Sequence, residues 1–191
     1  MSSLSIFGFS ISGFIIAYKR LFNKRNNKYK AREAEIVLLT GTENGSTHRF
    51  ARAVYEQLLD VGCKVYIDEM NTYRNYPGLR QLIIFTSTYG EGEAPSSATR
   101  FGKLVGKHPQ SGKVSYSVVG FGSTAYEHYC AYAREVDQLL RRQSWATPLT
   151  EVHTVNKRSV TDFANWAAVW SQHTTLPLSG DPGYYKKKCR K

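Results

Sequence analysis

Short apolar runs alternate with amphipathic stretches along most of this chain. Four runs rich in β-branched and aromatic residues are too short for helices and predict strands, at 35–40, 64–70, 82–87 and 116–122. Elsewhere apolar residues recur three or four positions apart and predict helices. These are Phe50, Val54 and Leu58; Phe101, Leu104 and Val105; Tyr132, Val136, Leu139 and Leu140; and Phe163, Trp166, Ala167 and Trp170.

Strands that are almost continuously apolar and alternate with helices indicate an α/β domain, a doubly wound parallel sheet with helices on both faces. A fifth strand is expected somewhere within 147–155, and the segment 71–81 has little helical pattern. The predicted domain covers residues 35–172. In this fold class ligands bind where the carboxyl ends of the strands meet the following loops, so the loops after the first, third and fourth strands are the ones to search.

The N-terminal segment differs from this body. Residues 4–18 carry no charge, and seven basic residues with no acid follow between Lys19 and Arg32. An apolar segment followed by positive charge is typical of a membrane anchor whose next domain lies on the cytoplasmic side. We expect residues 1–18 to be a single transmembrane anchor and 19–34 a basic linker. Because a spanning helix needs about 20 residues, a cleaved signal and an amphipathic surface segment are the alternatives.

The charge of the chain first suggests a nucleic-acid partner, since 191 residues carry a formal net charge of +11. Twelve of the 26 Lys and Arg lie within 19–32 and 186–191, however, so 33–185 holds 14 basic and all 15 acidic residues. We therefore expect no nucleic-acid binding. Residues 173–191 end in basic residues without an apolar pattern and are expected to be a linker or tail.

The cysteines and histidines indicate neither disulfides nor a metal. The three cysteines are odd in number and far apart, which is typical of a reduced compartment. The five histidines lack the spacing of a metal site. We expect no metal.

The loop after the first predicted strand is dense in glycine and hydroxyl residues and leads into a helix. Unpaired N–H groups and the helix dipole attract an anion at such a point. The loop lacks the lysine of a P-loop, so nucleotide triphosphate hydrolysis is not expected. We expect a single phosphate, held by Thr42, Asn44, Ser46 and Thr47. The alternative is a plain helix cap at Ser46 or Thr47.

The next two loops each contain a tyrosine among glycines, Tyr89 within 86–95 and Tyr126 within 120–130. Gly120 and Gly122 do not form a dinucleotide fingerprint, because the third glycine is missing. Two tyrosines at the same edge of the sheet suit a flat heterocycle held between aromatic faces.

The motifs TENGSTHRFA, TSTYGEGEAP and GFGSTAYEHYCAYA, in this order and spacing, resemble the FMN-binding domain of the diflavin reductases, the family of cytochrome P450 reductase and the sulfite reductase flavoprotein. The resemblance covers about residues 35–172 and implies a flavodoxin-like five-stranded fold and FMN as cofactor. It implies a phosphate site made by Thr42, Glu43, Asn44, Gly45, Ser46 and Thr47. It implies that the flavin ring is surrounded by Ser87, Thr88, Tyr89, Gly90, Phe121, Gly122, Ser123, Thr124, Ala125, Tyr126, Glu127, His128, Tyr129 and Cys130.

The resemblance also implies roles for single residues. Tyr89 and Tyr126 are expected to stack on the two faces of the ring, and the Gly90 backbone to hydrogen-bond to flavin N5. Two departures from the family stand out. Lys157 and Arg158 lie in the loop after the fifth strand, where the family usually has acidic residues, and Cys130 stands where asparagine is common.

The implied function is FMN-dependent transfer of single electrons. The electrons would come from a reductase module that contains FAD and takes hydride from NAD(P)H, either fused or separate, and would leave to a haem, iron or other acceptor. Glu91, Glu93 and Glu127 are expected to disfavour the anionic reduced flavin and to attract a basic partner. The alternatives are a membrane-tethered phosphate-ligand-binding module without a redox role and a free-standing quinone or nitro reductase, against which a covering Tyr126 argues.

Overall fold

The structure is a computed structural model, and it describes residues 27–189. Its strands are β1 (Ile36–Gly41), β2 (Val65–Glu69), β3 (Gln81–Ser87), β4 (Val114–Gly122), β5 (Ala146–Pro148) and β6 (His153–Asn156). Its helices are η1 (Ala31–Glu33), α2 (Ser46–Asp60), η2 (Met70–Thr72), α3 (Phe101–Lys107), α4 (Ala131–Arg141), α5 (Val160–Thr174) and α6 (Pro182–Cys189).

The strands form one parallel sheet in the order β2-β1-β3-β4-β5, and β6 also pairs with β4. Leu38 in the middle of β1 lies opposite Ile67 of β2 and Ile83 of β3. All six residues of β1 are buried, as a strand covered by helices on both faces requires. The predicted parallel α/β sheet is confirmed, and the carboxyl ends of β1, β3 and β4 lie side by side.

The fifth strand is divided. β5 pairs with Val114–Tyr116 at the beginning of β4, and β6 pairs with Val119–Gly122 at its end. Pro148 has no N–H to donate and is the last residue of β5. The sheet therefore has six strand segments in place of the expected five.

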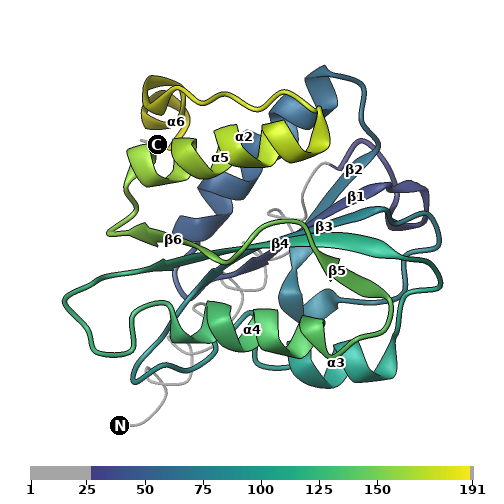
Figure 1. The fold of residues 1–191 in the computed structure, drawn as a ribbon, viewed down its shortest axis with the longest axis horizontal. Coiled ribbons are helices and arrows are strands. Elements are labelled where there is room, and N and C mark those ends of the chain that lie inside the picture. Colours follow the sequence, from purple (N-terminus) through teal and green to yellow (C-terminus); the bar gives the residue numbers. More distant parts are fainter. Residues whose placement is uncertain (1–26, 190–191) are drawn as a thin grey trace, which may run out of the picture.

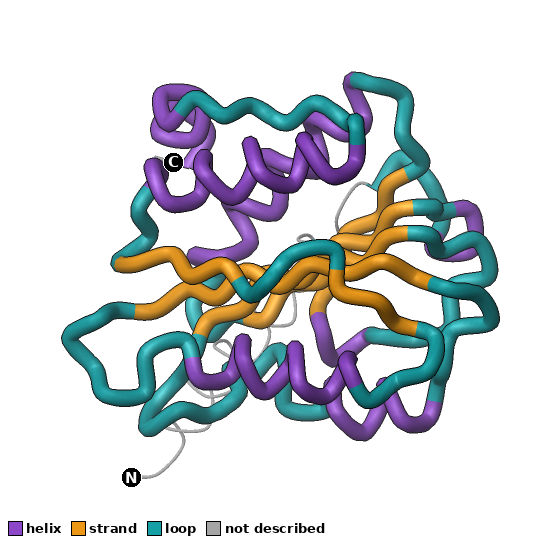
Figure 2. The backbone as a smooth tube through the Cα atoms, viewed as in Figure 1, coloured by secondary structure: helices purple, strands orange, loops and turns teal. Residues whose placement is uncertain are grey.

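Helices cover both faces of the sheet. Figure 1 shows α2, α5 and α6 on one face and α3 and α4 on the other, and Figure 2 shows the strands as the layer between them. Each face has its own apolar core. On the first face, Trp166 of α5 packs edge-on against Phe85 of β3, with ring centroids 5.2 Å apart. The segment 71–81, which has little helical pattern, contains no α-helix.

Helix α6 lies in the segment 173–191, where the sequence shows no apolar pattern. It packs against α2 and α5 (Figure 1). Tyr185 is fully buried and accepts a hydrogen bond from Gln57 Nε2 (3.3 Å), and Lys188 forms an ion pair with Glu56 (2.8 Å). This part of the chain therefore belongs to the folded body.

The expected membrane anchor at 1–18 lies outside the described residues. Within residues 27–189, no helix is both long and apolar enough to cross a bilayer. The described part of the basic linker docks on the sheet edge, where the Asn27 side chain exchanges two hydrogen bonds with the backbone of Ile67 in β2 (3.0 and 2.9 Å).

Candidate functional site

The loop between β1 and α2 is folded by its own side chains. Gly45 is the N-cap of α2 and adopts a left-handed conformation (φ 81°), which favours glycine. Its N–H donates to Thr42 Oγ1 (2.9 Å), and the N–H of Ser46 donates to Asn44 Oδ1 (3.3 Å). The residues of the predicted phosphate site thus form a compact turn at the start of a helix.

Thr47, at the start of α2, carries a buried hydroxyl next to this turn. Its hydroxyl is fully buried and has no hydrogen-bond partner among the described residues. A buried hydroxyl without a partner costs free energy, which a bound anion would recover. The alternative of a plain helix cap at Ser46 or Thr47 is wrong, because both lie inside α2 and its N-cap is Gly45.

Ser97 fixes this loop from another part of the chain, and sequence reasoning missed it. Its hydroxyl accepts the N–H of Thr42 (2.8 Å) and donates to the carbonyl of Thr42 (3.0 Å). The adjacent N–H of Ser96 donates to the Glu43 carboxylate (2.8 Å). The turn at 96–100 therefore clamps both ends of the Thr42–Glu43 segment.

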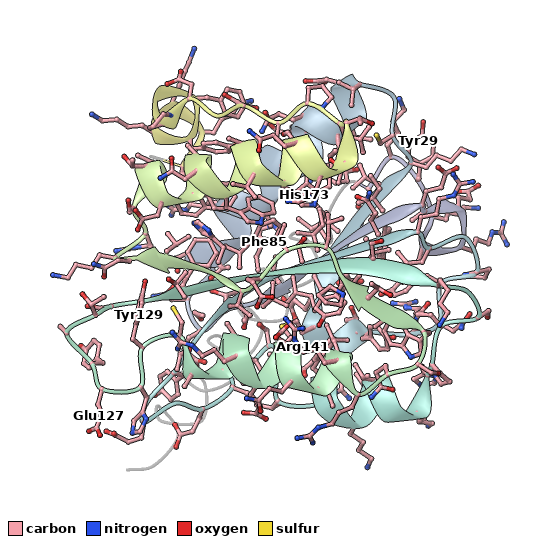
Figure 3. All side chains as sticks on the ribbon, viewed as in Figure 1. Tyr29, Phe85, Glu127, Tyr129, Arg141 and His173 are labelled. Carbon is pink, nitrogen blue, oxygen red and sulfur yellow. The ribbon has the colours of Figure 1, made fainter. Side chains whose placement is uncertain are left out.

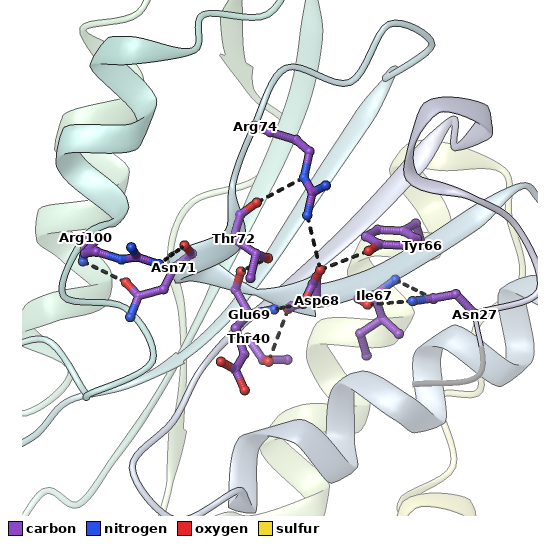
Figure 4. A network of polar contacts seen from close by, with 10 residues as sticks. All are labelled: Asn27, Thr40, Tyr66, Ile67, Asp68, Glu69, Asn71, Thr72, Arg74 and Arg100. Carbon is purple, nitrogen blue, oxygen red and sulfur yellow. Dashed lines mark hydrogen bonds and ion pairs between the residues drawn. The ribbon is translucent and has the colours of Figure 1, made fainter. Parts of the chain in front are cut away.

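Asn71 of η2 holds that turn in place. Its N–H donates to Ser97 O (2.9 Å), its side-chain amide donates to Ser96 O (2.8 Å), and its Oδ1 accepts the N–H of Arg100 (2.7 Å). Figure 4 shows Asn71 linked to Arg100 by hydrogen bonds, beside the polar network of Asp68. The phosphate loop is thus linked through Ser97 and Asn71 to the carboxyl end of β2.

The loop after β3 presents Tyr89. The N–H of Tyr89 donates to Glu93 O (3.0 Å) and the N–H of Glu93 donates to Tyr89 O (2.8 Å), which closes a narrow hairpin. Gly90 has φ 50°, in the left-handed region that favours glycine. Glycine therefore suits position 90 of this hairpin, and Tyr89 remains 54% exposed.

The loop after β4 presents Tyr126, which is 71% exposed. Its N–H donates to Ser123 O (3.1 Å), and the N–H of Thr124 donates to Asn156 Oδ1 at the end of β6 (3.1 Å). Figure 3 shows Glu127 at the outer part of this loop and Tyr129 nearer to the sheet. Both tyrosines of the predicted ring site thus stand exposed on loops with an ordered backbone.

Cys130 anchors the buried end of that loop. It is fully buried, has φ 53° at the N-cap of α4, and its Sγ would lie 3.1 Å from a Cβ on Gly122. Burial raises the pKa of the thiol to about 11, although a hydrogen bond with Tyr129 partly offsets this. Cys130 is therefore a packing residue with a thiol that stays protonated at neutral pH.

The remaining predicted residues lie around these loops. The Phe121 ring points away from them into the core, 5.1 Å from the Phe50 ring, so only its backbone faces the site and accepts the N–H of Thr88 (3.2 Å). His128 lies 3.8 Å from the carboxylate of Glu91. Among residues 27–189 there is no cluster of three or more metal-ligating side chains.

Comparison with known proteins identifies the class. The flavodoxin family matches residues 38–166, and the chain belongs to this family. Two solved structures share the fold: flavodoxin 2 from Bacillus cereus (TM-score 0.62, 21% identity, 73% of this chain and 99% of that one), and a flavodoxin from Streptococcus pneumoniae (TM-score 0.56, 22% identity, 74% and 95%).

Curated relatives narrow the class to the diflavin reductase type. The chain is similar to the sulfite reductase (NADPH) flavoprotein alpha-component of Neisseria meningitidis serogroup C, with 27% identity over 147 residues, 75% of this chain and 24% of that protein. The protein of the same name from Shewanella oneidensis is 32% identical over 110 residues, 55% of this chain and 18% of that one. The chain thus spans a quarter or less of the length of these relatives. It is an FMN-binding flavodoxin-like domain of this type.

The residues at the site fit FMN. The unpaired hydroxyl of Thr47 and the N-terminus of α2 suit its phosphate, and two exposed tyrosines on neighbouring loops suit its ring. FMN, when bound, supplies the one-electron chemistry, while the protein supplies position and electrostatics.

Proposed function

We propose that this FMN electron-transfer domain takes single electrons from a reductase module that contains FAD and oxidises NAD(P)H, and passes them to a haem, iron or other acceptor. The reductase module is either fused to this chain in a longer protein or a separate partner. The name of the sulfite reductase relatives, which specifies NADPH, supports NADPH as the source of electrons. The proposal includes no nucleic-acid partner.

One observation carries this proposal: the site combines a fixed anion loop with exposed aromatic side chains. The loop at Thr42–Thr47 would hold the FMN phosphate through backbone N–H groups and the Thr47 hydroxyl. Tyr89 and Tyr126 would flank the ring, and their exposure of 54% and 71% supports a ring site at the protein surface. A surface site suits electron exchange with another protein, since electrons pass between centres brought close by docking.

Acidic side chains at this surface support the proposal that a basic partner protein binds on one side of the site. Glu91, with 90% of its side chain exposed, follows Tyr89, and the exposed Glu127 follows Tyr126. Negative charge beside the ring would also disfavour the anionic reduced flavin.

We further propose that residues 1–18 anchor the chain in a membrane, with the flavodoxin domain on the cytoplasmic side. The support is the uncharged segment 4–18 and the basic cluster after it. Alkaline extraction of membranes tests this: the full chain should stay in the membrane pellet, and a chain without residues 1–18 should be released. Release of both would contradict the anchor.

The main experiment is an absorbance spectrum of the full chain purified in a neutral detergent, followed by stepwise reduction with dithionite. We expect oxidised-flavin bands, a one-electron-reduced state during the titration, and release of FMN on denaturation. A colourless protein that also fails to take up added FMN would contradict the proposal and favour binding of another phosphate-containing ligand.

A further inference from the structure

A pocket of about 270 Å³ lies beside the phosphate loop, on the side of the sheet covered by α2, α5 and α6. We call it the cationic pocket. It is lined by Ser46, Arg49, Phe50, Lys157, Arg158, Val160, Lys186 and Cys189. Its four basic residues come from three separate parts of the chain: the first turns of α2, the loop between β6 and α5, and α6.

The cationic pocket adjoins the flavin site. Ser46 belongs both to the pocket and to the predicted phosphate site. The N–H of Lys157 donates to the carbonyl of Gly122 (2.7 Å), at the point where the Tyr126 loop leaves β4. A molecule that covers the pocket would therefore also lie near the edge of the ring site.

The positive charge in the pocket is uncompensated. The lining contains no acidic residue, and among residues 27–189 none of the four cations pairs with a carboxylate. Farther along α2, by contrast, Glu56 pairs with Arg52 of the same helix (3.4 Å) and with Lys188 of α6 (2.8 Å). Four like charges around one cavity repel each other and are stabilised when an anionic surface approaches.

The loop that carries two of these cations has an unusual backbone. Lys157 and Arg158 have φ values of 47° and 60°, a left-handed conformation that is unfavourable for residues other than glycine. The α2–α6 packing brings Lys186 to the same pocket, where Arg49 also donates to the carbonyl of Cys189 (3.4 Å). The fold therefore gathers these charges through several independent contacts.

We propose that the cationic pocket docks an acidic surface of an electron-transfer partner protein. This rests on the proposed function, because the partner must come close to the flavin. All four cations are exposed, so they attract charge across solvent and do not enclose a ligand. An acidic protein surface therefore fits better than a small anion.

At the carboxyl end of the sheet, negative and positive charges then lie on different parts of the surface. The acidic Glu91 and Glu127 lie on the two tyrosine loops, and the cationic pocket lies beside the phosphate loop. Such a division fixes the orientation of a partner as well as attracting it, because the wrong orientation brings like charges together.

The test uses the full chain in neutral detergent and two oxidised haem proteins as probes, the acidic cytochrome b5 and the basic cytochrome c. The variant is Lys157→Glu with Arg158→Glu. Its matched control is Lys103→Glu with Lys107→Glu on α3, which changes net charge equally on the opposite face of the sheet. Calorimetric titration at low and physiological ionic strength measures binding.

We expect the 157/158 variant to bind cytochrome b5 about tenfold more weakly at low salt, with a smaller salt dependence, since docking charges act in this range. It should bind cytochrome c no more weakly than the parent chain does. The control should change cytochrome b5 binding far less. Lys186→Glu, a single change on α6, should weaken cytochrome b5 binding in the same direction and guards against misfolding of the strained loop.

Equal weakening by the variant and its control would overturn the proposal, since net charge alone would then explain it. Saturable binding of inorganic pyrophosphate that is lost in the 157/158 variant, with cytochrome b5 binding unchanged, would also overturn it and assign the pocket to a small phosphate ligand. Binding between oxidised proteins needs no electron transfer, and FMN content is measured separately by absorbance. Failure of this inference is therefore distinguishable from failure of the proposed function.

Discussion

The phosphate loop and the two tyrosine loops meet at the same edge of the sheet but are built differently. The phosphate loop is held by Ser97 on both sides of Thr42, and its Thr47 hydroxyl is buried. The tyrosine loops have an ordered backbone, yet Tyr89 and Tyr126 project into solvent and are 54% and 71% exposed. The phosphate loop is thus held by hydrogen bonds in the absence of a ligand, whereas the other two loops present two exposed aromatic side chains.

This difference indicates that the phosphate loop and the tyrosine loops contribute to FMN binding in different ways. A rigid loop loses little conformational entropy when it binds phosphate, so it can supply much of the affinity for FMN. In the proposed site, the two exposed tyrosines would contribute less affinity but would leave the ring edge accessible to partner proteins. Substitutions in the two regions should therefore differ in size and in kind.

Removal of the orphan hydroxyl should have the largest effect. Thr47→Val keeps the side-chain shape but removes the hydroxyl that we propose donates to the phosphate, and a hydrogen bond to a charged group is worth about 1.5–3 kcal/mol. We expect FMN, followed by fluorescence titration, to bind about ten- to a hundredfold more weakly.

The stability of the FMN-free Thr47→Val protein should not fall, because the hydroxyl has no partner among the described residues to lose. Thr40→Val is the matched control: its buried hydroxyl donates to Asp68 O (3.3 Å), so this change should destabilise the fold by about 1 kcal/mol and leave FMN affinity unchanged. If Thr47→Val binds FMN as tightly as the parent chain does, the proposed role of the Thr47 hydroxyl in phosphate binding is wrong.

The buried end of the Tyr126 loop gives a prediction about pH. The Cys130 pKa is raised from 9.0 to about 11, so between these values the unfolded chain loses a proton that the folded chain keeps. The free energy of unfolding should therefore fall as pH rises through this window, by roughly 2 kcal/mol from Cys130.

Urea unfolding across this pH window checks the prediction. Cys130→Ala should remove the Cys130 share of the fall. Cys189→Ala should remove a separate share, since burial also raises the Cys189 pKa to about 11. If the free energy of unfolding depends on pH in the same way in Cys130→Ala and in the parent chain, the Cys130 thiol is as accessible to solvent as the outer part of the loop.

The clamp on the phosphate loop should contribute a smaller amount. Ser97→Ala removes two hydrogen bonds to Thr42, worth about 1 kcal/mol each. We expect a loss of stability of about 1–2 kcal/mol and FMN binding about three- to tenfold weaker, because the loop must then be ordered by the ligand. Ser111→Ala, which removes an exposed hydroxyl that accepts from Asn75 (3.2 Å), should leave FMN binding unchanged. If Ser97→Ala and Ser111→Ala bind FMN equally tightly, FMN binding does not depend on the hydrogen bonds between Ser97 and Thr42.

The smallest effect on FMN binding is expected at the two exposed tyrosines. Tyr126→Ala removes one stacking partner, worth about 0.5–1.5 kcal/mol, so FMN should dissociate about three- to tenfold more readily in equilibrium dialysis. Because Tyr126 is 71% exposed, stability without FMN should stay within about 0.5 kcal/mol. Val169→Ala, at another exposed apolar position, serves as control, and full FMN retention in Tyr126→Ala would contradict the stacking role.

The sheet could be predicted from the sequence because its signal is local. The apolar runs at 35–40 and 82–87 lie within a residue of β1 (Ile36–Gly41) and β3 (Gln81–Ser87). The stripe through Phe163 and Trp166 is buried as its helical spacing predicted. Each of these signals depends on burial of the segment itself.

Features that depend on distant partners could not be predicted. Helix α6 has one fully buried side chain, Tyr185, and is held by contacts with Gln57 and Glu56 far away in the sequence. Ser97 lies among small polar residues typical of any turn, so its bonds to Thr42 leave no local pattern. The cationic pocket likewise exists only after three segments pack together, although Lys157 and Arg158 could be noticed as a departure from the family.

The parallel order of the sheet has a consequence for how the chain reaches its native state. β1, β3 and β4 must be side by side before their three loops share an edge, yet Leu38, Ile83 and Ser117, which are neighbours across these strands, are far apart in the sequence. Closing such long connections costs conformational entropy before the strands make any stabilising contacts, so folding is slow. FMN then has nothing to bind until the sheet is nearly complete, so the cofactor should extend the lifetime of the folded protein by slowing unfolding, without hastening its formation.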